Sequence, residues 1–91
     1  NQARVNLGVD TQASINAMSR ETFESLPNKP KLSPCQLAAY SFDGKSPIQS
    51  IGSFRTTIKA NGRSAVCDFV VFEGVRDNLL GFKSCVQLGL V

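Results

Sequence analysis

An aspartate stands at the end of an apolar segment near the start of the chain. Val5, Leu7 and Val9 alternate with polar residues and glycine, which is the period of a strand with one buried face. Asp10 follows directly, where the strand ends and a loop begins. Such a carboxylate can transfer protons in catalysis, although a single carboxylate after a strand is more often a turn former or a helix cap. Other parts of the chain must therefore support a catalytic role.

A second motif stands far along the chain, where Asn78-Leu79-Leu80-Gly81-Phe82 combines two apolar residues with a glycine. Taken alone, it is typical of ordinary core before a helix. The motif becomes informative because it occurs in the same chain as Asp10.

The residue types in the chain exclude several other kinds of catalytic and metal site. The chain has no histidine, which removes the usual zinc patterns and any nucleophile paired with histidine. Cys35, Cys67 and Cys85 are an odd number at wide spacings and favour free thiols in a reducing compartment. We expect no metal and no cofactor.

Length and charge limit the possible partners. With 91 residues the chain predicts one domain, residues 1–91, too small for two lobes with a cleft between them. A cleft would need a partner. The net charge of +3 is spread without a run of cations, so nucleic-acid binding is not favoured. No apolar run approaches the roughly 20 residues of a membrane span, and we expect a soluble, intracellular domain without a membrane partner.

The first half of the chain predicts a short helix and a hairpin. Ser19 can cap a helical turn that reaches Leu26 and ends at Pro27. Residues 27–34 are an exposed connection. Residues 37–40 and 48–51 flank Asp43-Gly44, a turn signal that indicates a hairpin with a polar tip.

The second half is mostly β. Residues 54–59 alternate and lead to Asn61-Gly62, the strongest short hairpin signal in the sequence. The return strand, residues 65–72, becomes apolar on both faces and should lie centrally in the sheet. Residues 82–88 predict a closing helix, with Gly89 as its stop.

The order of these features resembles the retropepsins, the retroviral-type aspartic proteases, and especially the protease domains of gypsy-type long-terminal-repeat retrotransposons. The resemblance runs from about Val5 to Val91. It is carried by Val9-Asp10-Thr11, Asp43-Gly44-Lys45, Asn61-Gly62, Leu79-Leu80-Gly81 and Leu88-Gly89-Leu90. It implies a mostly β fold, a closed antiparallel barrel with one short C-terminal helix, which forms half of a homodimeric aspartic protease.

The resemblance also implies a role for each site residue. Asp10 would be the catalytic residue, one from each chain. Thr11 would join the two active-site loops across the dimer axis, and Ala13 and Ser14 would line the substrate channel. Leu79, Leu80 and Gly81 would pack beneath the aspartate loop. The flap that closes over an extended peptide would comprise Ser41, Phe42, Asp43, Gly44 and Lys45.

Three departures from the family pattern stand out. Gln12 replaces a glycine that gives the loop its bend and lets substrate approach. Phe82-Lys83 stands where viral enzymes often carry an arginine paired with an aspartate just after the active-site loop, and that loop has Ser14 instead. Family members usually have outer strands at both ends that build the dimer interface, and we expect residues 1–91 to lack them.

Two functions are therefore possible, and the effect of Gln12 on the active-site loop distinguishes them. One is an aspartic endopeptidase that processes a retroelement polyprotein in the cytoplasm or within a virus-like particle. The other is a catalytically silent module kept for dimerisation or for binding an extended peptide by strand addition. An unrelated small β-barrel that binds a ligand is a weaker third alternative.

Overall fold

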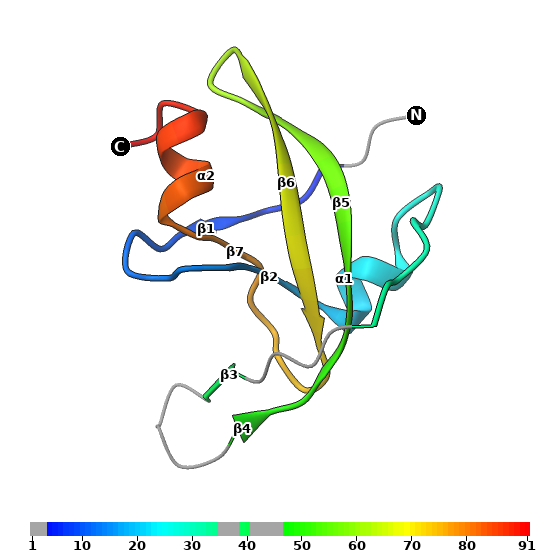
Figure 1. Cartoon of the computed structure of the whole chain (residues 1–91). Helices are drawn as coiled ribbons and strands as arrows, with labels where there is room; N and C mark the ends of the chain where they lie inside the picture. The colour runs from blue at the N-terminus through cyan, green and yellow to red at the C-terminus, as the bar shows by residue number, and fades with distance from the viewer. Residues whose placement is uncertain (1–3, 35–38, 41–46) are drawn as a thin grey trace.

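A long hairpin is the main feature of the structure, a computed structural model that describes residues 4–34, 39–40 and 47–91 (Figure 1). Strands β5 (Ser50–Ala60) and β6 (Arg63–Phe72) pair antiparallel from Phe54↔Phe69 to Ala60↔Arg63. The turn between them uses two residues with positive φ, Asn61 at 54° and Gly62 at 70°. Two central residues with positive φ give the turn a twist that matches the right-handed twist of the flanking strands. The hairpin predicted at Asn61-Gly62 is therefore confirmed.

Five strands form the main sheet in the order β1-β7-β2-β6-β5. The three short strands are β1 (Gly8–Val9), β2 (Asn16–Ser19) and β7 (Leu79–Leu80). β2 runs parallel to β6 and antiparallel to β7, while β1 runs parallel to β7. β6 lies inside the sheet, as predicted from its apolar run.

Two expectations about the sheet need correction. The described strands form an open sheet with β1 and β5 at its edges, so the closed barrel is not seen. The segment before Asp10 forms a strand only over Gly8–Val9, whereas the alternation suggested a longer one. Leu7 instead packs against the core from outside a strand.

Both predicted helices are present and short. In α1 (Arg20–Glu24) the Ser19 hydroxyl accepts a hydrogen bond from the Thr22 amide at 3.1 Å, as expected for a capping residue. α2 (Phe82–Gln87) confirms the C-terminal helix. Its end has the bonds of a Schellman motif, because the Leu90 amide donates to the Cys85 carbonyl and Gly89 has φ 69°.

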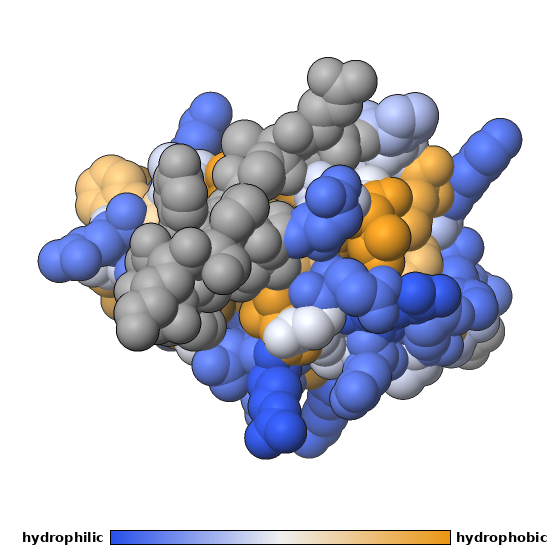
Figure 2. All heavy atoms as spheres, turned by 90° about the horizontal axis from the view of Figure 1, so that it is seen from below, coloured by the Kyte–Doolittle hydropathy of each residue, from blue (hydrophilic) through white to orange (hydrophobic). Residues whose placement is uncertain are grey.

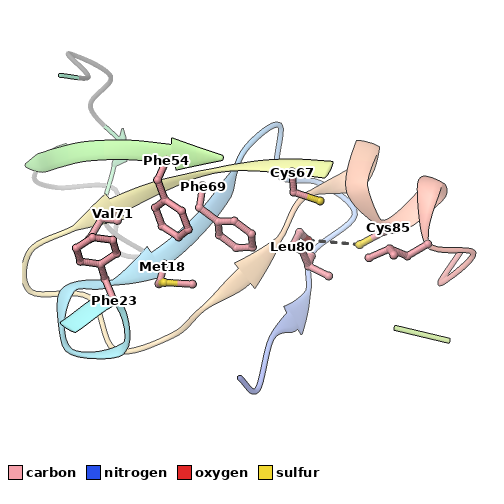
Figure 3. Close-up of a cluster of buried hydrophobic side chains, with 9 residues drawn as sticks. Met18, Phe23, Phe54, Cys67, Phe69, Val71, Leu80 and Cys85 are labelled. Carbon is pink, nitrogen blue, oxygen red and sulfur yellow. Dashed lines mark hydrogen bonds between the residues drawn. The ribbon is translucent and has the colours of Figure 1, made fainter. Parts of the chain in front are cut away.

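The core lies between the long hairpin, β2, β7 and the two helices. Phe54 contacts both Phe23 and Phe69, with ring centroids 5.3 and 5.7 Å apart. Figure 3 shows these rings directed into one interior with the other labelled side chains. The buried cluster comprises Met18, Phe23, Phe54, Cys67, Phe69, Val71, Leu80, Cys85 and Leu88. Cys67 and Cys85 are free thiols, as expected, while Cys35 lies outside the described residues.

The coloured part of the face in Figure 2 is largely hydrophilic, with separate apolar patches. None of the helices within the described part of the chain is long and apolar enough to cross a membrane. β3 (Ala39–Tyr40) pairs antiparallel with β4 (Pro47–Ile48), which agrees with the predicted hairpin. The predicted flap residues at its tip, Ser41, Phe42, Asp43, Gly44 and Lys45, lie outside the described residues.

Candidate active site

Asp10 opens a tight loop directly after β1. Its amide donates to the Leu80 carbonyl at 2.9 Å, which continues the β1–β7 pairing by one bond. Within the loop, the Ala13 amide donates to the Asp10 carbonyl at 3.1 Å and the Gln12 amide donates to Asp10 Oδ1 at 3.1 Å. The backbone therefore holds one carboxylate oxygen of the half-buried Asp10 in place.

No cation pairs with Asp10 in the part of the chain that the structure describes. The ion pairs there are Arg20–Glu73, Lys29–Glu24 and Arg55–Asp68. Arg55 Nε lies 2.8 Å from Asp68 Oδ1, and this hydrogen bond holds the pKa of Asp68 below its usual value. Among the described residues, the Asp10 carboxylate is therefore not part of a structural ion pair.

The segment that ends β7 supports the Asp10 loop from behind. The Leu80 carbonyl accepts a hydrogen bond from the Asp10 amide, and the Phe82 amide donates one to the Ala13 carbonyl at 2.9 Å. Gly81 lies between them with no room for a side chain, because a Cβ would stand 2.8 Å from the Ala13 carbonyl oxygen. Of the three residues predicted beneath the loop, Leu80 and Gly81 are buried and Leu79 is half-buried, paired with Gly8.

Asn16, which the sequence did not single out, bonds the segment behind the Asp10 loop. Its Oδ1 accepts the Gly81 amide at 2.8 Å, and its Nδ2 donates to the Asp68 carbonyl and to Ser84 Oγ, each at 2.9 Å. Asn16 and Ser84 are both 6% exposed. An amide side chain within the apolar run Ile15 to Met18 was the available signal, because buried polar groups need partners.

Gln12 causes no backbone strain in this loop. Among the described residues other than glycine, only Asn61 has a positive φ, so the backbone at Gln12 does not require glycine. The bend that we expected to depend on glycine is made by the bond from the Gln12 amide to Asp10. The side chain is exposed, as are Thr11 and Ser14, while Ala13 is half-buried.

A groove among the described residues lies away from Asp10. It measures about 650 Å³ between residues 4–7, the connection after α1 and β5, and its walls include Leu7, Met18, Leu26, Phe54 and Ile58. Asp10 does not line this groove. Within residues 4–34, 39–40 and 47–91, no cluster of ligating side chains could hold a metal ion.

Of the comparisons with known proteins, the one with solved structures finds a likeness. No family model matches the sequence, and no curated protein matches it. Among solved structures, the EIAV protease in complex with an inhibitor superposes with a TM-score of 0.78 at 18% identity, over 91% of this chain and 75% of that one. At this identity the likeness concerns the fold. The chain has a retropepsin-like fold.

Proposed function

We propose that this chain is one subunit of a homodimeric aspartic endopeptidase in which each copy contributes Asp10. One observation carries the proposal: a carboxylate with no cation partner among the described residues stands on a loop whose backbone is bonded to Leu80 and Phe82, in a chain with the fold of a retroviral protease. In this proposal a second copy of the chain supplies the second aspartate of the site.

The chemistry follows from two aspartates that share one site. Two carboxylates about 3 Å apart cannot both be ionised, so the pair holds one proton and titrates as a unit. The charged carboxylate removes a proton from a water molecule, which attacks the carbonyl carbon of the peptide bond. The neutral carboxyl donates a hydrogen bond to the carbonyl oxygen and stabilises the charge that develops there. The carboxyl that took the proton from water then gives it to the nitrogen of the peptide bond, the C–N bond breaks, and the pair again holds one proton.

The substrate in this proposal is an extended polypeptide. Thr11 joins the two loops across the dimer axis, and Ala13 and Ser14 line the channel. The flap, Ser41 to Lys45, closes over the peptide and excludes water. We further propose that the substrate is a retroelement polyprotein of the gypsy type, processed in the cytoplasm or within a virus-like particle.

A catalytically silent module is the second candidate, and the exposed Gln12 beside Asp10 favours it. Its side chain can fill the space that a peptide needs next to the carboxylates. Because its amide already bonds Asp10, the side chain and not the backbone is the obstacle. Such a module would still dimerise and could bind an extended peptide by strand addition.

The test combines sedimentation with a peptidase assay on an unstructured polypeptide in weakly acidic buffer. A homodimeric site predicts that the cleavage rate rises faster than linearly with protein concentration, over the range where sedimentation shows dimers forming. Asp10→Asn should dimerise equally and cleave nothing, because an amide still accepts the Gln12 amide but cannot share a proton. Cleavage by the monomer, or by Asp10→Asn, would refute the endopeptidase. Dimers that never cleave would favour the silent module.

A further inference from the structure

A buried asparagine joins three elements behind the Asp10 loop. Asn16 stands at the start of β2, and its side chain bonds β6 through the Asp68 carbonyl, α2 through Ser84, and the end of β7 through the Gly81 amide. We propose that Asn16 is a positioning residue that sets the place of the Asp10 carboxylate through Gly81. This inference rests on the proposed function for its effect on catalysis.

The three bonds require a primary amide. Gly81 needs an acceptor, whereas the Asp68 carbonyl needs a donor, and Asn16 supplies both from one planar group. The Asp68 and Ser84 partners fix that plane at two points. The remaining oxygen of the amide therefore points at the Gly81 N–H with little freedom to turn.

Gly81 transmits this position to the loop. On one side it is held by Asn16, and on the other a Cβ would stand 2.6 and 2.8 Å from the carbonyl oxygens of Ile15 and Ala13. The residues before and after it, Leu80 and Phe82, bond the first and last residues of the 10–13 loop. A shift of Gly81 therefore moves both ends of the loop that carries the carboxylate.

The decisive variant is Asn16→Asp, which keeps the shape and makes one donor depend on pH. When ionised, the introduced carboxylate cannot donate a hydrogen bond to the Asp68 carbonyl. One of its oxygens would then face the Asp68 carbonyl oxygen at 2.9 Å, the length of the bond that Asn16 Nδ2 makes in the parent protein. When protonated, it can donate there again. Because burial raises the pKa of a carboxyl, this switch should lie above the range of an exposed aspartate.

The readout is the set of backbone amide NMR signals of Gly81, Gln12 and Ala13, measured between pH 4 and 7 in an Asp10→Asn background that removes the titration of Asp10. With Asn16→Asp, all three signals should shift together with one midpoint, and should return toward the parent positions at low pH. If Gly81 shifts while Gln12 and Ala13 stay at their parent positions, Asn16 does not position the loop.

Two control variants separate positioning from general destabilisation. Asn78 is a matched asparagine, whose Oδ1 accepts the Ser19 amide at 2.8 Å and whose Nδ2 donates to Thr22 at 3.0 Å, at the far end of β2. Asn78→Asp should leave the Gln12 and Ala13 signals in place. Ser84→Ala keeps the bond to Gly81 and should move them far less than Asn16→Asp does. Equal shifts in either control would overturn the proposal, as would loop signals unchanged in Asn16→Asp.

Activity gives an independent second readout. With Asp10 present, Asn16→Asp should lower kcat at pH 7 by on the order of ten- to a hundredfold with KM nearly unchanged, and should recover toward pH 5, since a misplacement of about 1 Å can cost a hundredfold. An equal fall of kcat at pH 7 and pH 5, without recovery, would indicate a merely structural role. If the parent protein cleaves nothing, the proposed function fails, while the NMR comparison still decides the role of Asn16.

Discussion

Gly81 lies so close to Ile15 that a Cβ on the glycine would stand 2.6 Å from the Ile15 carbonyl oxygen. Both groups are backbone, so neither can swing aside as a flexible side chain could. The residue that follows β7 therefore lies directly against the backbone just before β2. At Gly81, the glycine that follows Leu79 and Leu80, two backbone segments thus approach each other closely behind the candidate catalytic carboxylate of Asp10.

Gly81→Ala should destabilise the protein by about 2–3 kcal/mol, because the added methyl forces two backbone segments apart. Urea unfolding would measure the loss. Gly8→Ala is the control, since its Cβ would meet the end of the Leu79 side chain at 3.0 Å and the Asn78 carbonyl oxygen at an ordinary contact distance of 3.7 Å. A loss for Gly81→Ala no larger than that for Gly8→Ala would contradict the close contact.

Local chemistry explains the parts of the fold that the sequence predicted. Asn61-Gly62 supplied the two left-handed residues of the β5–β6 turn, and Ser19 supplied the cap of α1. The apolar run of β6 predicted its internal place in the sheet. Each of these features depends on neighbours in sequence, which is why composition and spacing could indicate it.

The missed features depend on contacts between distant segments. β2 has four residues and pairs with β6 some fifty positions away, so no period along the chain could identify it. The bonds from Asn16 to Gly81 and Ser84 span 65 and 68 positions. An open rather than closed sheet likewise depends on which edges pair, and strand periodicity says nothing about that. The roles assigned to Asp10, Thr11 and the flap residues stay predictions.

The Arg55–Asp68 pair predicts a small dependence of stability on pH. Arg55 lowers the pKa of Asp68 from the ordinary 3.8, so this stabilisation is present above pH 3.8 and is lost as the pH falls through the lower value in the folded protein. Asp68→Asn should therefore cost a little stability at pH 7 and nothing at the acid end. Both side chains are more than half exposed, so added salt should also shrink the difference. A deficit that is constant from pH 7 to acid would exclude this pair as its source.

The buried thiols predict slow cysteine chemistry in the native state. Cys67 is 3% exposed and Cys85 is 0% exposed, and Cys85 Sγ donates to the Leu80 carbonyl at 3.5 Å. In a Cys35→Ser variant, which retains only these two thiols, reaction with a thiol reagent should be no faster than unfolding. Unfolded protein in urea should react at once. Rapid labelling of the native variant would show that one of the two is accessible.

Gln12→Gly should reduce stability by about 0.5–1 kcal/mol, because glycine gains freedom in the unfolded chain while the loop needs no positive φ. The bond from residue 12 to Asp10 Oδ1 is made by the backbone and should survive. Thermal unfolding of the two proteins would measure the difference. An increase in stability would show that Gln12 strains the loop.

The catalytic role of Asp10 is tested most directly by peptidase activity in weakly acidic buffer. Three proteins are compared: the wild type, Gln12→Gly, and Gln12→Gly combined with Asp10→Asn. If Gln12 crowds a channel beside a working aspartate pair, Gln12→Gly should cleave an unstructured polypeptide faster than the wild type, by up to about a hundredfold. Adding Asp10→Asn should abolish that activity. Cleavage by Gln12→Gly that survives Asp10→Asn would contradict the central claim that Asp10 is the catalytic residue.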